Sequence, residues 1–349
     1  MDLLQALQAG DMAAVRAAVK ADPAAVKIPR MIGTAAGRGL LPAVQLLHRH
    51  GADLNAAWRN YRPIHNLMQT DPHAAAGKPE PARMACLEWM LAHGADPERT
   101  GGWPAARALI VAAFVGEPEY VKRLLEAGAR VDGFTGAALG DTGLVEKTLR
   151  ERPEFARERD AGALTALQCA AGSRLPGVDI VRVATILLDA GADPNAVTRT
   201  WGSDVNAAYF ACGAKNSGMF ELLLERGADA TGAVSHAVWG KHYELAERAL
   251  AHGAQLDAAT ANGKPLLNDL IRWGQIPQTR WMLAHGASPN VADAEGWTAA
   301  HQAASRGNAR LLQAVMDAGA DVRRRDGEGL TPRELARARK REKMAALLE

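Results

Sequence analysis

The sequence predicts an all-α protein built as an array of helical repeats, and three observations support this. A short element recurs along the chain, as in HGADLN at 50–55 and HGADPE at 93–98. Each copy follows an amphipathic run such as LLQAVMDAG, in which apolar residues recur at helical spacing. The last three copies place their glycines, Gly253, Gly286 and Gly319, 33 residues apart. A fixed period of this kind is the sequence signature of a repeat architecture.

The recurring glycine fits a helix end that requires a left-handed residue. Glycine adopts that conformation without the steric penalty that a Cβ atom brings. In four copies a histidine precedes the glycine (His50, His93, His252 and His285), where it lies at the negative end of the helix dipole. The eight glycines predicted to end helices in this way are Gly51, Gly94, Gly128, Gly191, Gly227, Gly253, Gly286 and Gly319.

The full pattern resembles the ankyrin repeat, and residues 293–323 (DAEGWTAAHQAASRGNARLLQAVMDAGADVR) carry the resemblance best. They contain a finger, a helix start similar to TPLHxAA, a glycine between two helices and an ending similar to LLxxGADV. The matching positions are Gly296, Thr298, His301, Gly307 and Gly319. The resemblance covers nearly the whole chain and implies an all-α solenoid of about eleven helix pairs joined by short β-turn fingers, which forms a single elongated, curved domain. The pairs are expected to start near residues 2, 31, 62, 104, 134, 164, 203, 233, 265, 298 and 331.

We expect one array over residues 1–349, with an N-terminal capping repeat at 1–30, internal repeats at 31–330 and a C-terminal capping repeat at 331–349. The third and sixth repeats carry extra residues between their helices, and the second, fifth and eighth are shortened. Gly39, Gly140 and Lys241 fall between the helices of the short repeats, 101 residues apart, which predicts a larger unit of three repeats. The basic segment TPRELARARKREKMAALLE keeps its leucines at helical spacing, so its Arg and Lys residues are interpreted as a solvated outer face.

Composition and charge exclude several classes of function. The 349 residues carry a net charge of +2 from 41 basic and 39 acidic residues, which predicts binding neither to nucleic acid nor to an anionic membrane. No apolar run approaches the roughly 20 residues of a membrane-spanning helix, and MDLLQALQAGDMAAV is not expected to be a signal peptide. Cys86, Cys169 and Cys212 lie in apolar segments and are expected to be reduced core thiols. We therefore expect a cytoplasmic protein, and the Ala- and Arg-rich composition suggests a bacterial source.

Every candidate for chemistry in the sequence has a structural interpretation. The histidines of HRH at 48–50 would diverge by about 200° around a helix, so they do not form a metal site. His65 and His301 match the TPLH histidine, which in the ankyrin family hydrogen-bonds loop backbone between repeats. The sequence contains no nucleophile elbow, phosphate-binding loop or dinucleotide-binding glycine pattern. We predict a non-enzyme with no catalytic residue, no metal and no cofactor, and ankyrin arrays rarely catalyse reactions alone.

The eight tryptophans fall into two groups. Trp89 and Trp281 both stand five residues before a capping glycine, and this identical placement predicts packing. The other six lie in fingers or at the ends of first helices, where ankyrin arrays concentrate their binding residues. With neighbouring Arg, Lys and Tyr side chains, which are typical of binding hot spots, they form the candidate site. The candidates are Trp58, Arg59, Tyr61, Arg62, Trp103, Arg199, Trp201, Tyr209, Trp239, Lys264, Arg272, Trp273, Trp297 and Arg306.

The resemblance implies a non-catalytic binding module that recognises a protein or an extended peptide in a concave groove of fingers and first helices. An alternative is a small aromatic or acidic ligand, held between tryptophans and arginines in a pocket of that groove. A third possibility is a passive scaffold that orients other proteins. The sequence leaves these three open.

Overall fold

The computed structural model describes residues 1–68, 80–200, 203–260 and 263–349. These residues form twenty-two α-helices, two short 3₁₀-helices and two three-residue strands. The chain divides into two compact units. The first comprises Met1–Trp201 and Ala214–Leu222, and the second comprises Gly202–Gly213 and Leu223–Glu349. None of the described helices combines the length and the apolar character that crossing a bilayer requires.

In the first unit, twelve helices follow one another as six pairs, and the two helices of each pair contact each other. The first three pairs are α1 (Leu3–Ala9) with α2 (Met12–Ala21), α3 (Pro29–Gly37) with α4 (Leu41–Arg49), and α5 (Pro63–Met68) with α6 (Pro81–Ala92). The next three are α7 (Ala108–Val115) with α8 (Pro118–Glu126), α9 (Gly133–Leu139) with α10 (Thr142–Glu151), and α11 (Ala166–Gly172) with α12 (Ile180–Asp189). The 3₁₀-helices η1 (Pro23–Lys27) and η2 (Pro153–Arg157) follow α2 and α10, and the strand β1 (Thr198–Thr200) comes last.

The second unit repeats the same organisation. Its four helix pairs are α15 (Thr231–Trp239) with α16 (Tyr243–Ala251), α17 (Leu266–Arg272) with α18 (Ile276–Ala284), α19 (Ala299–Arg306) with α20 (Ala309–Asp317), and α21 (Pro332–Ala338) with α22 (Glu342–Leu347). The strand β2 (Ser203–Val205) precedes α13 (Ala207–Ala214), and α14 (Ser217–Glu225) follows it. Both of these helices include residues assigned to each unit.

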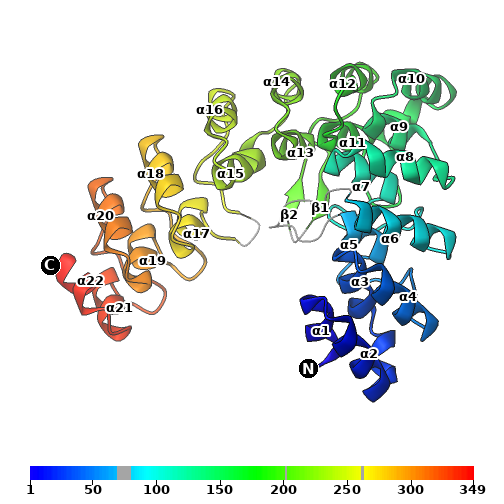
Figure 1. The fold of residues 1–349 in the computed structure, drawn as a ribbon. Helices are drawn as coiled ribbons and strands as arrows, with labels where there is room; N and C mark the ends of the chain where they lie inside the picture. Colours follow the sequence, from blue (N-terminus) through cyan, green and yellow to red (C-terminus); the bar gives the residue numbers. More distant parts are fainter. Residues whose placement is uncertain (69–79, 201–202, 261–262) are drawn as a thin grey trace. The chain divides into compact units, whose positions relative to one another are not determined.

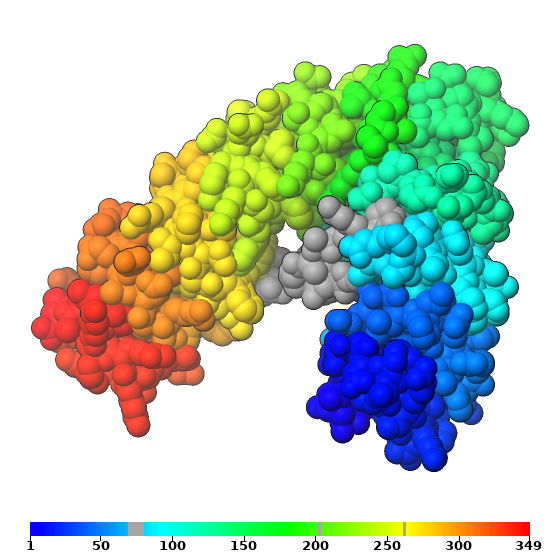
Figure 2. Space-filling model, viewed as in Figure 1, coloured from blue at the N-terminus to red at the C-terminus, as the bar shows by residue number. Residues whose placement is uncertain are grey.

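Within each unit the helices form two layers, which can be followed in Figure 1. The first helix of a pair contacts the first helix of the next, as α17 contacts α19 and α19 contacts α21. The second helices do the same, as α18 contacts α20 and α20 contacts α22. In the space-filling view, consecutive segments of the second unit accordingly appear as adjacent bands of colour (Figure 2). Buried alanines such as Ala299, Ala300, Ala303 and Ala304 allow this close helix contact, because their side chains occupy little space.

The predicted helix-ending glycines are confirmed. All eight adopt the left-handed conformation, with φ between 84° and 95°. The residues expected between the helices of the short repeats also lie in this region, with φ of 68° at Gly39, 76° at Gly140 and 59° at Lys241. A lysine in this conformation is strained where glycine is not. The chain reversal between α15 and α16 therefore requires the left-handed turn even where the sequence supplies no glycine.

The two TPLH-type histidines connect neighbouring segments, as the resemblance implies. The ring of His65 is fully buried, and its Nε2 lies 3.0 Å from the carbonyl oxygen of Ala106. The Nε2 of His301 lies 3.1 Å from the carbonyl oxygen of Leu330, while its Nδ1 accepts a hydrogen bond from the Thr298 backbone at 3.2 Å. Burial lowers the pKa of His65 to about 4 and also lowers the pKa of His301. Both rings are therefore held as neutral parts of the scaffold.

Acidification is expected to destabilise the protein through His65. Its pKa is about 4 in the folded protein, against about 6.5 when unfolded. A neutral His65 therefore contributes stability in full above pH 6.5, and this contribution is lost as the pH falls from 6.5 to 4. The loss amounts to about 3 kcal/mol at pH 4. Urea unfolding of the wild type and His65→Gln at pH 7 and pH 4 measures it: the stability difference between the two proteins should shrink by that amount, and an unchanged difference would contradict the assignment.

Candidate functional site

A pocket lined mainly by cationic side chains lies in the second unit, beside the C-terminal ends of α17, α19 and α21. Its volume is about 660 Å³, which is within the range of ligand-binding pockets. Four of the predicted site residues are brought together here: Lys264, Arg272, Trp297 and Arg306. We call this site the arginine pocket. Its lining residues are Lys264, Arg272, Trp297, Gln302, Ser305, Arg306, Arg339 and Arg341.

Two positions of the repeat build the arginine pocket. Arg306 and Arg339 share one position, directly before the left-handed residues Gly307 and Lys340; in α17 this position is Trp273, and Arg272 lies one residue before it. A cation is favoured at the C-terminal end of a helix, where the dipole is negative. Lys264 and Trp297 each stand two residues before the next first helix begins, 33 residues apart. The stacking of α17, α19 and α21 then brings these positions together.

Trp297 forms a fixed wall of the pocket. Its backbone nitrogen donates to the Asp293 Oδ1 at 2.8 Å, and its carbonyl oxygen accepts from the Asn268 Nδ2 at 2.8 Å. The indole is half-buried, and the guanidinium carbon of Arg339 lies 5.0 Å from its ring centre, in the geometry of a cation–π contact. Because both its backbone and its ring are held, the indole is positioned before any ligand binds.

Lys264 is the one lining cation that is neutralised within the chain's described residues. Its Nζ lies 3.2 Å from the Asp293 Oδ2 and 3.2 Å from the Glu295 Oε2. Partial burial opposes the charge of Lys264, but the two carboxylates outweigh it and raise the pKa of the lysine. The hydrogen bond from Lys264 also lowers the pKa of Glu295. Lys264 therefore supports the loop that holds Trp297.

The other four cations of the pocket, Arg272, Arg306, Arg339 and Arg341, are exposed. Within the part of the chain that the structure describes, none of their guanidinium groups forms an ion pair with a carboxylate. Four like charges around one open pocket repel each other and attract an anion. Arg339 and Arg341 were missed at the sequence level because the basic C-terminal segment was interpreted as a solvated face. Adding one 33-residue period to Arg306 would have found Arg339.

Two further predicted tryptophans lie in the same unit, at the ends of first helices. Trp273 directly follows α17 and is 62% exposed, with the Arg272 guanidinium carbon 6.0 Å from its ring centre. Trp239 is the last residue of α15 and is 37% exposed. Tyr209 is half-buried in α13, with its ring centre 4.9 Å from that of His236, and burial raises its pKa to about 12.

In the first unit the predicted residues Trp58 to Arg62 form a finger. Trp58 and Tyr61 pair as an antiparallel bridge, and the two residues between them are left-handed, with φ of 49° at Arg59 and 69° at Asn60. This geometry is that of a tight two-residue hairpin. Trp58 is 41% exposed, and Arg59 is exposed beside it. The Arg62 guanidinium instead donates to the backbone carbonyls of Thr100, at 2.9 Å, and Asn55.

Two further predicted residues lie elsewhere in the first unit. Trp103 is half-buried next to the following finger, and Arg199 is exposed on β1. Trp201 lies outside the described residues. In the second unit, the structure brings four of the candidates together in the arginine pocket.

Trp89 and Trp281, which the sequence assigns to packing, adopt the same arrangement. Each indole stacks on the histidine four residues later, with ring centres 3.9 Å apart for Trp89 and His93 and 4.0 Å apart for Trp281 and His285. In both cases the histidine Nδ1 lies 2.8 Å from the tryptophan carbonyl oxygen. Trp281 also stacks on Tyr243, at 5.4 Å. These contacts agree with a structural role on the second helices.

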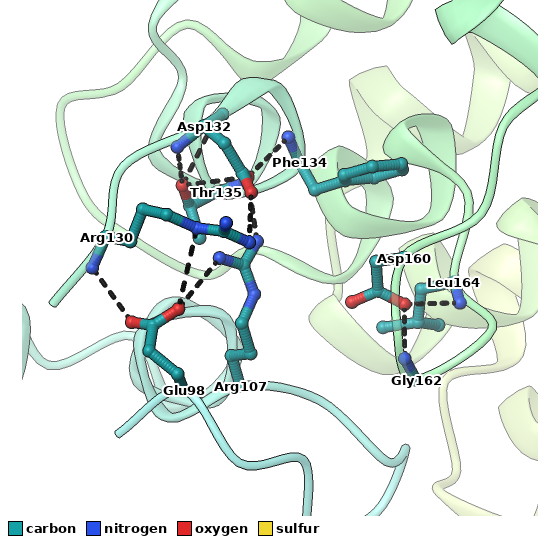
Figure 3. Close-up of polar contacts among 9 residues, drawn as sticks. All are labelled: Glu98, Arg107, Arg130, Asp132, Phe134, Thr135, Asp160, Gly162 and Leu164. Atoms are coloured by element: carbon teal, nitrogen blue, oxygen red, sulfur yellow. Dashed lines mark hydrogen bonds and ion pairs between the residues drawn. The ribbon is translucent and has the colours of Figure 1, made fainter. Parts of the chain in front are cut away.

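A network of ion pairs connects the fingers of the first unit (Figure 3). The guanidinium of Arg107 is 5% exposed and lies 3.2 Å from the Glu98 carboxylate and 2.7 Å from that of Asp132. Asp132 caps α9 and accepts hydrogen bonds from the backbone of Phe134 and Thr135. Arg107 is not among the residues predicted from the sequence, although it stands directly before the apolar run ALIVAAFV.

The three cysteines are free and buried, as predicted. Burial raises the pKa of Cys86 to about 11 and that of Cys212 to about 12, and it also raises the pKa of Cys169. Such thiols are protonated at neutral pH and poorly nucleophilic. Within the described residues, no group of three or more His, Cys, Asp or Glu side chains is arranged to hold a metal ion.

Comparisons with known proteins relate this site to a family. Residues 282–336, which include Trp297 and Arg306, match the family model for ankyrin repeats (many copies). Among solved structures, the chain is similar to the human ASB11 ankyrin repeat domain at 23% sequence identity, over 63% of this chain and 98% of that one, with a TM-score of 0.46. No curated protein matches the sequence. The resemblance to ankyrin repeats is thus confirmed for residues 282–336, and such repeats are generally protein-interaction modules without catalytic activity.

Proposed function

We propose that the protein is a non-catalytic binding module that recognises another protein or an extended peptide through its fingers and the ends of its first helices. The exposure of three tryptophans at these positions carries the proposal: 62% for Trp273, 41% for Trp58 and 37% for Trp239. Exposed indole surface is costly in water, and a partner that covers it recovers that free energy. Tryptophan is also among the residues that contribute most to binding hot spots.

The ankyrin match over residues 282–336 supports this proposal, because protein interaction is the general role of such repeats. The proposal extends the same architecture to a single array of about eleven helix pairs, with capping repeats at both ends and a cytoplasmic location. Pairing of first and second helices within each unit supports the extension.

One observation favours a second candidate, a small aromatic or acidic ligand. The arginine pocket combines a fixed indole, Trp297, with four guanidinium groups in about 660 Å³. Such a pocket offers a stacking surface and paired hydrogen-bond donors to a carboxylate or phosphate. A passive scaffold is the third candidate, and it predicts that no single surface side chain is needed for function.

The proposal is tested by comparing what the wild type and Trp273→Ala retain from cell extract. We expect at least one polypeptide to bind the wild type and to be reduced at least tenfold on Trp273→Ala, because losing a hot-spot side chain costs 2 kcal/mol or more, that is, about 30-fold in affinity. Arg310→Gln, an exposed change on the second helix α20, is the control and should retain it. Equal capture by all three proteins would contradict the proposal, and a low-mass compound found by native mass spectrometry would favour the second candidate.

A further inference from the structure

The unpaired cations of the arginine pocket form a line along successive helix ends. Arg306 and Arg339 occupy the same position, directly before the left-handed residues Gly307 and Lys340, and Arg272 is the last residue of α17, one position earlier than the equivalent Trp273. Those helices are neighbours, α17 against α19 and α19 against α21. Packed helices lie about 8–10 Å apart, so the three positions extend over about 20 Å. A compact small molecule does not reach across such a distance.

An extended polypeptide matches this spacing. In a polyproline-type conformation each residue advances about 3.1 Å and every third residue faces the same side. Side chains at positions i, i+3 and i+6 therefore lie on one face, about 9 Å apart, close to the separation of the arginines. Carboxylates at those three positions would each meet one guanidinium, the group that binds carboxylates most specifically.

The surroundings of the pocket favour a short acidic segment over a nucleic acid. Asp293 and Glu295 lie against Lys264 at the finger side of the pocket, and the Glu295 side chain is 62% exposed. A continuous polyanion that ran past this edge would be repelled by these carboxylates. The apolar faces of Trp297 and of the exposed Trp273 suit the side chains between the acids, because aromatic surfaces accept extended proline-rich segments.

We propose that the arginine pocket binds an extended acidic segment of a partner protein, with acidic residues at every third position and one carboxylate on each of Arg272, Arg306 and Arg339. This inference rests on the proposed binding function and names the chemistry of the partner at that site. Neighbouring Arg341 adds to the positive field, and Lys264 acts indirectly by holding the loop of Trp297.

The test is binding of a fluorescein-labelled peptide, (Glu-Pro-Pro)₃, to the full chain, measured by fluorescence anisotropy. A peptide of the same composition with its three glutamates adjacent is the spacing control, and (Gln-Pro-Pro)₃ is the charge control. We expect the spaced peptide to bind at least fivefold more tightly than the control with adjacent glutamates. The peptide with glutamine should bind at least tenfold more weakly. Arg306→Gln should weaken binding of the spaced peptide about tenfold, and Arg310→Gln, which removes the same charge on the second helix α20 outside the pocket, by less than twofold.

Several results would overturn the inference. Equal binding of the two glutamate peptides would show general charge attraction, and tighter binding of a nine-nucleotide oligo-dT would show a nucleic-acid site. Full competition by succinate or inorganic phosphate at similar affinity would show a small-anion site. Absence of any binding, with an unchanged circular dichroism spectrum of the protein, would also overturn it. If Trp273→Ala still abolishes capture of a polypeptide in that case, the proposed function stands and only the acidic specificity is lost.

Discussion

Replacing Arg107 by methionine is expected to lower the free energy of unfolding of the first unit by about 3 kcal/mol. The guanidinium is 5% exposed and is the partner of both Glu98 and Asp132. Methionine fills part of the space but removes the hydrogen bond from Arg107 that holds the pKa of the half-buried Asp132 low against burial, and leaves Asp132 only the exposed Arg130 as an ion-pair partner. Hydrogen exchange of the amides in α7 and α9 measures the effect, because Arg107 lies at the start of α7 and Asp132 at the start of α9.

Arg130→Met is the matched control for this prediction. Arg130 faces the same two carboxylates, at 3.8 Å from Glu98 and 3.3 Å from Asp132, but its side chain is 70% exposed. An exposed ion pair contributes at most about 1 kcal/mol, so this variant should exchange almost as slowly as the wild type. Equal effects of the two substitutions would show that burial of Arg107 does not determine its contribution.

Replacing Gly162 by alanine is expected to destabilise the first unit by 3 kcal/mol or more, a magnitude seen when overpacking forces the backbone to move. A Cβ at this position would lie 1.9 Å from the carbonyl oxygen of Ala105 and 2.8 Å from its carbon. Both atoms belong to the backbone of the preceding finger, so the clash cannot be relieved by rotating a side chain. The Asp160 side chain also holds this loop, accepting from the nitrogens of Gly162 at 2.9 Å and Leu164 at 2.8 Å (Figure 3).

Gly143→Ala is the control within the same unit, and it is expected to raise the stability of the unit. Gly143 is the second residue of α10, and a Cβ there would meet only a side-chain oxygen of Asp141, at 3.6 Å. Alanine in a helix is favoured over glycine by about 0.5–1 kcal/mol, so this variant should gain stability. Thermal unfolding followed by circular dichroism compares the two. A Gly162→Ala protein as stable as the wild type would contradict the close contact between fingers.

The repeated turns were predictable from the sequence because their cause is local. A residue such as Gly253 or Gly319 ends a helix through its own backbone conformation, and the requirement recurs with the period. Lys241 adopts the same left-handed conformation although it is not glycine, and the repeat period alone predicted that it lies between two helices. The packing role assigned to Trp89 and Trp281 rested on the same reasoning, and their stacked histidines agree with it.

The site was less predictable because its charges depend on distant partners. Lys264 and Arg62 were both expected to contact a ligand, yet one is neutralised by Asp293 and Glu295 and the other donates to backbone carbonyls. Long cationic side chains can reach several neighbours, and local sequence does not show which ones. Arg339 was missed for the converse reason: a run of charges was interpreted by composition, whereas its position in the repeat places it in the arginine pocket.

Site-specific photo-crosslinking tests most directly whether the arginine pocket is the recognition surface. A benzophenone attached at Ser305→Cys would lie in the pocket, and one at Gln313→Cys would lie on the second-helix layer of the same unit. The native cysteines are buried, so labelling should be confined to the introduced thiol. With (Glu-Pro-Pro)₃ as the probe, we predict crosslinks from position 305 that Arg306→Gln removes, and none above background from position 313. Equal crosslinking from both positions, or from 313 alone, would contradict recognition at the ends of the first helices.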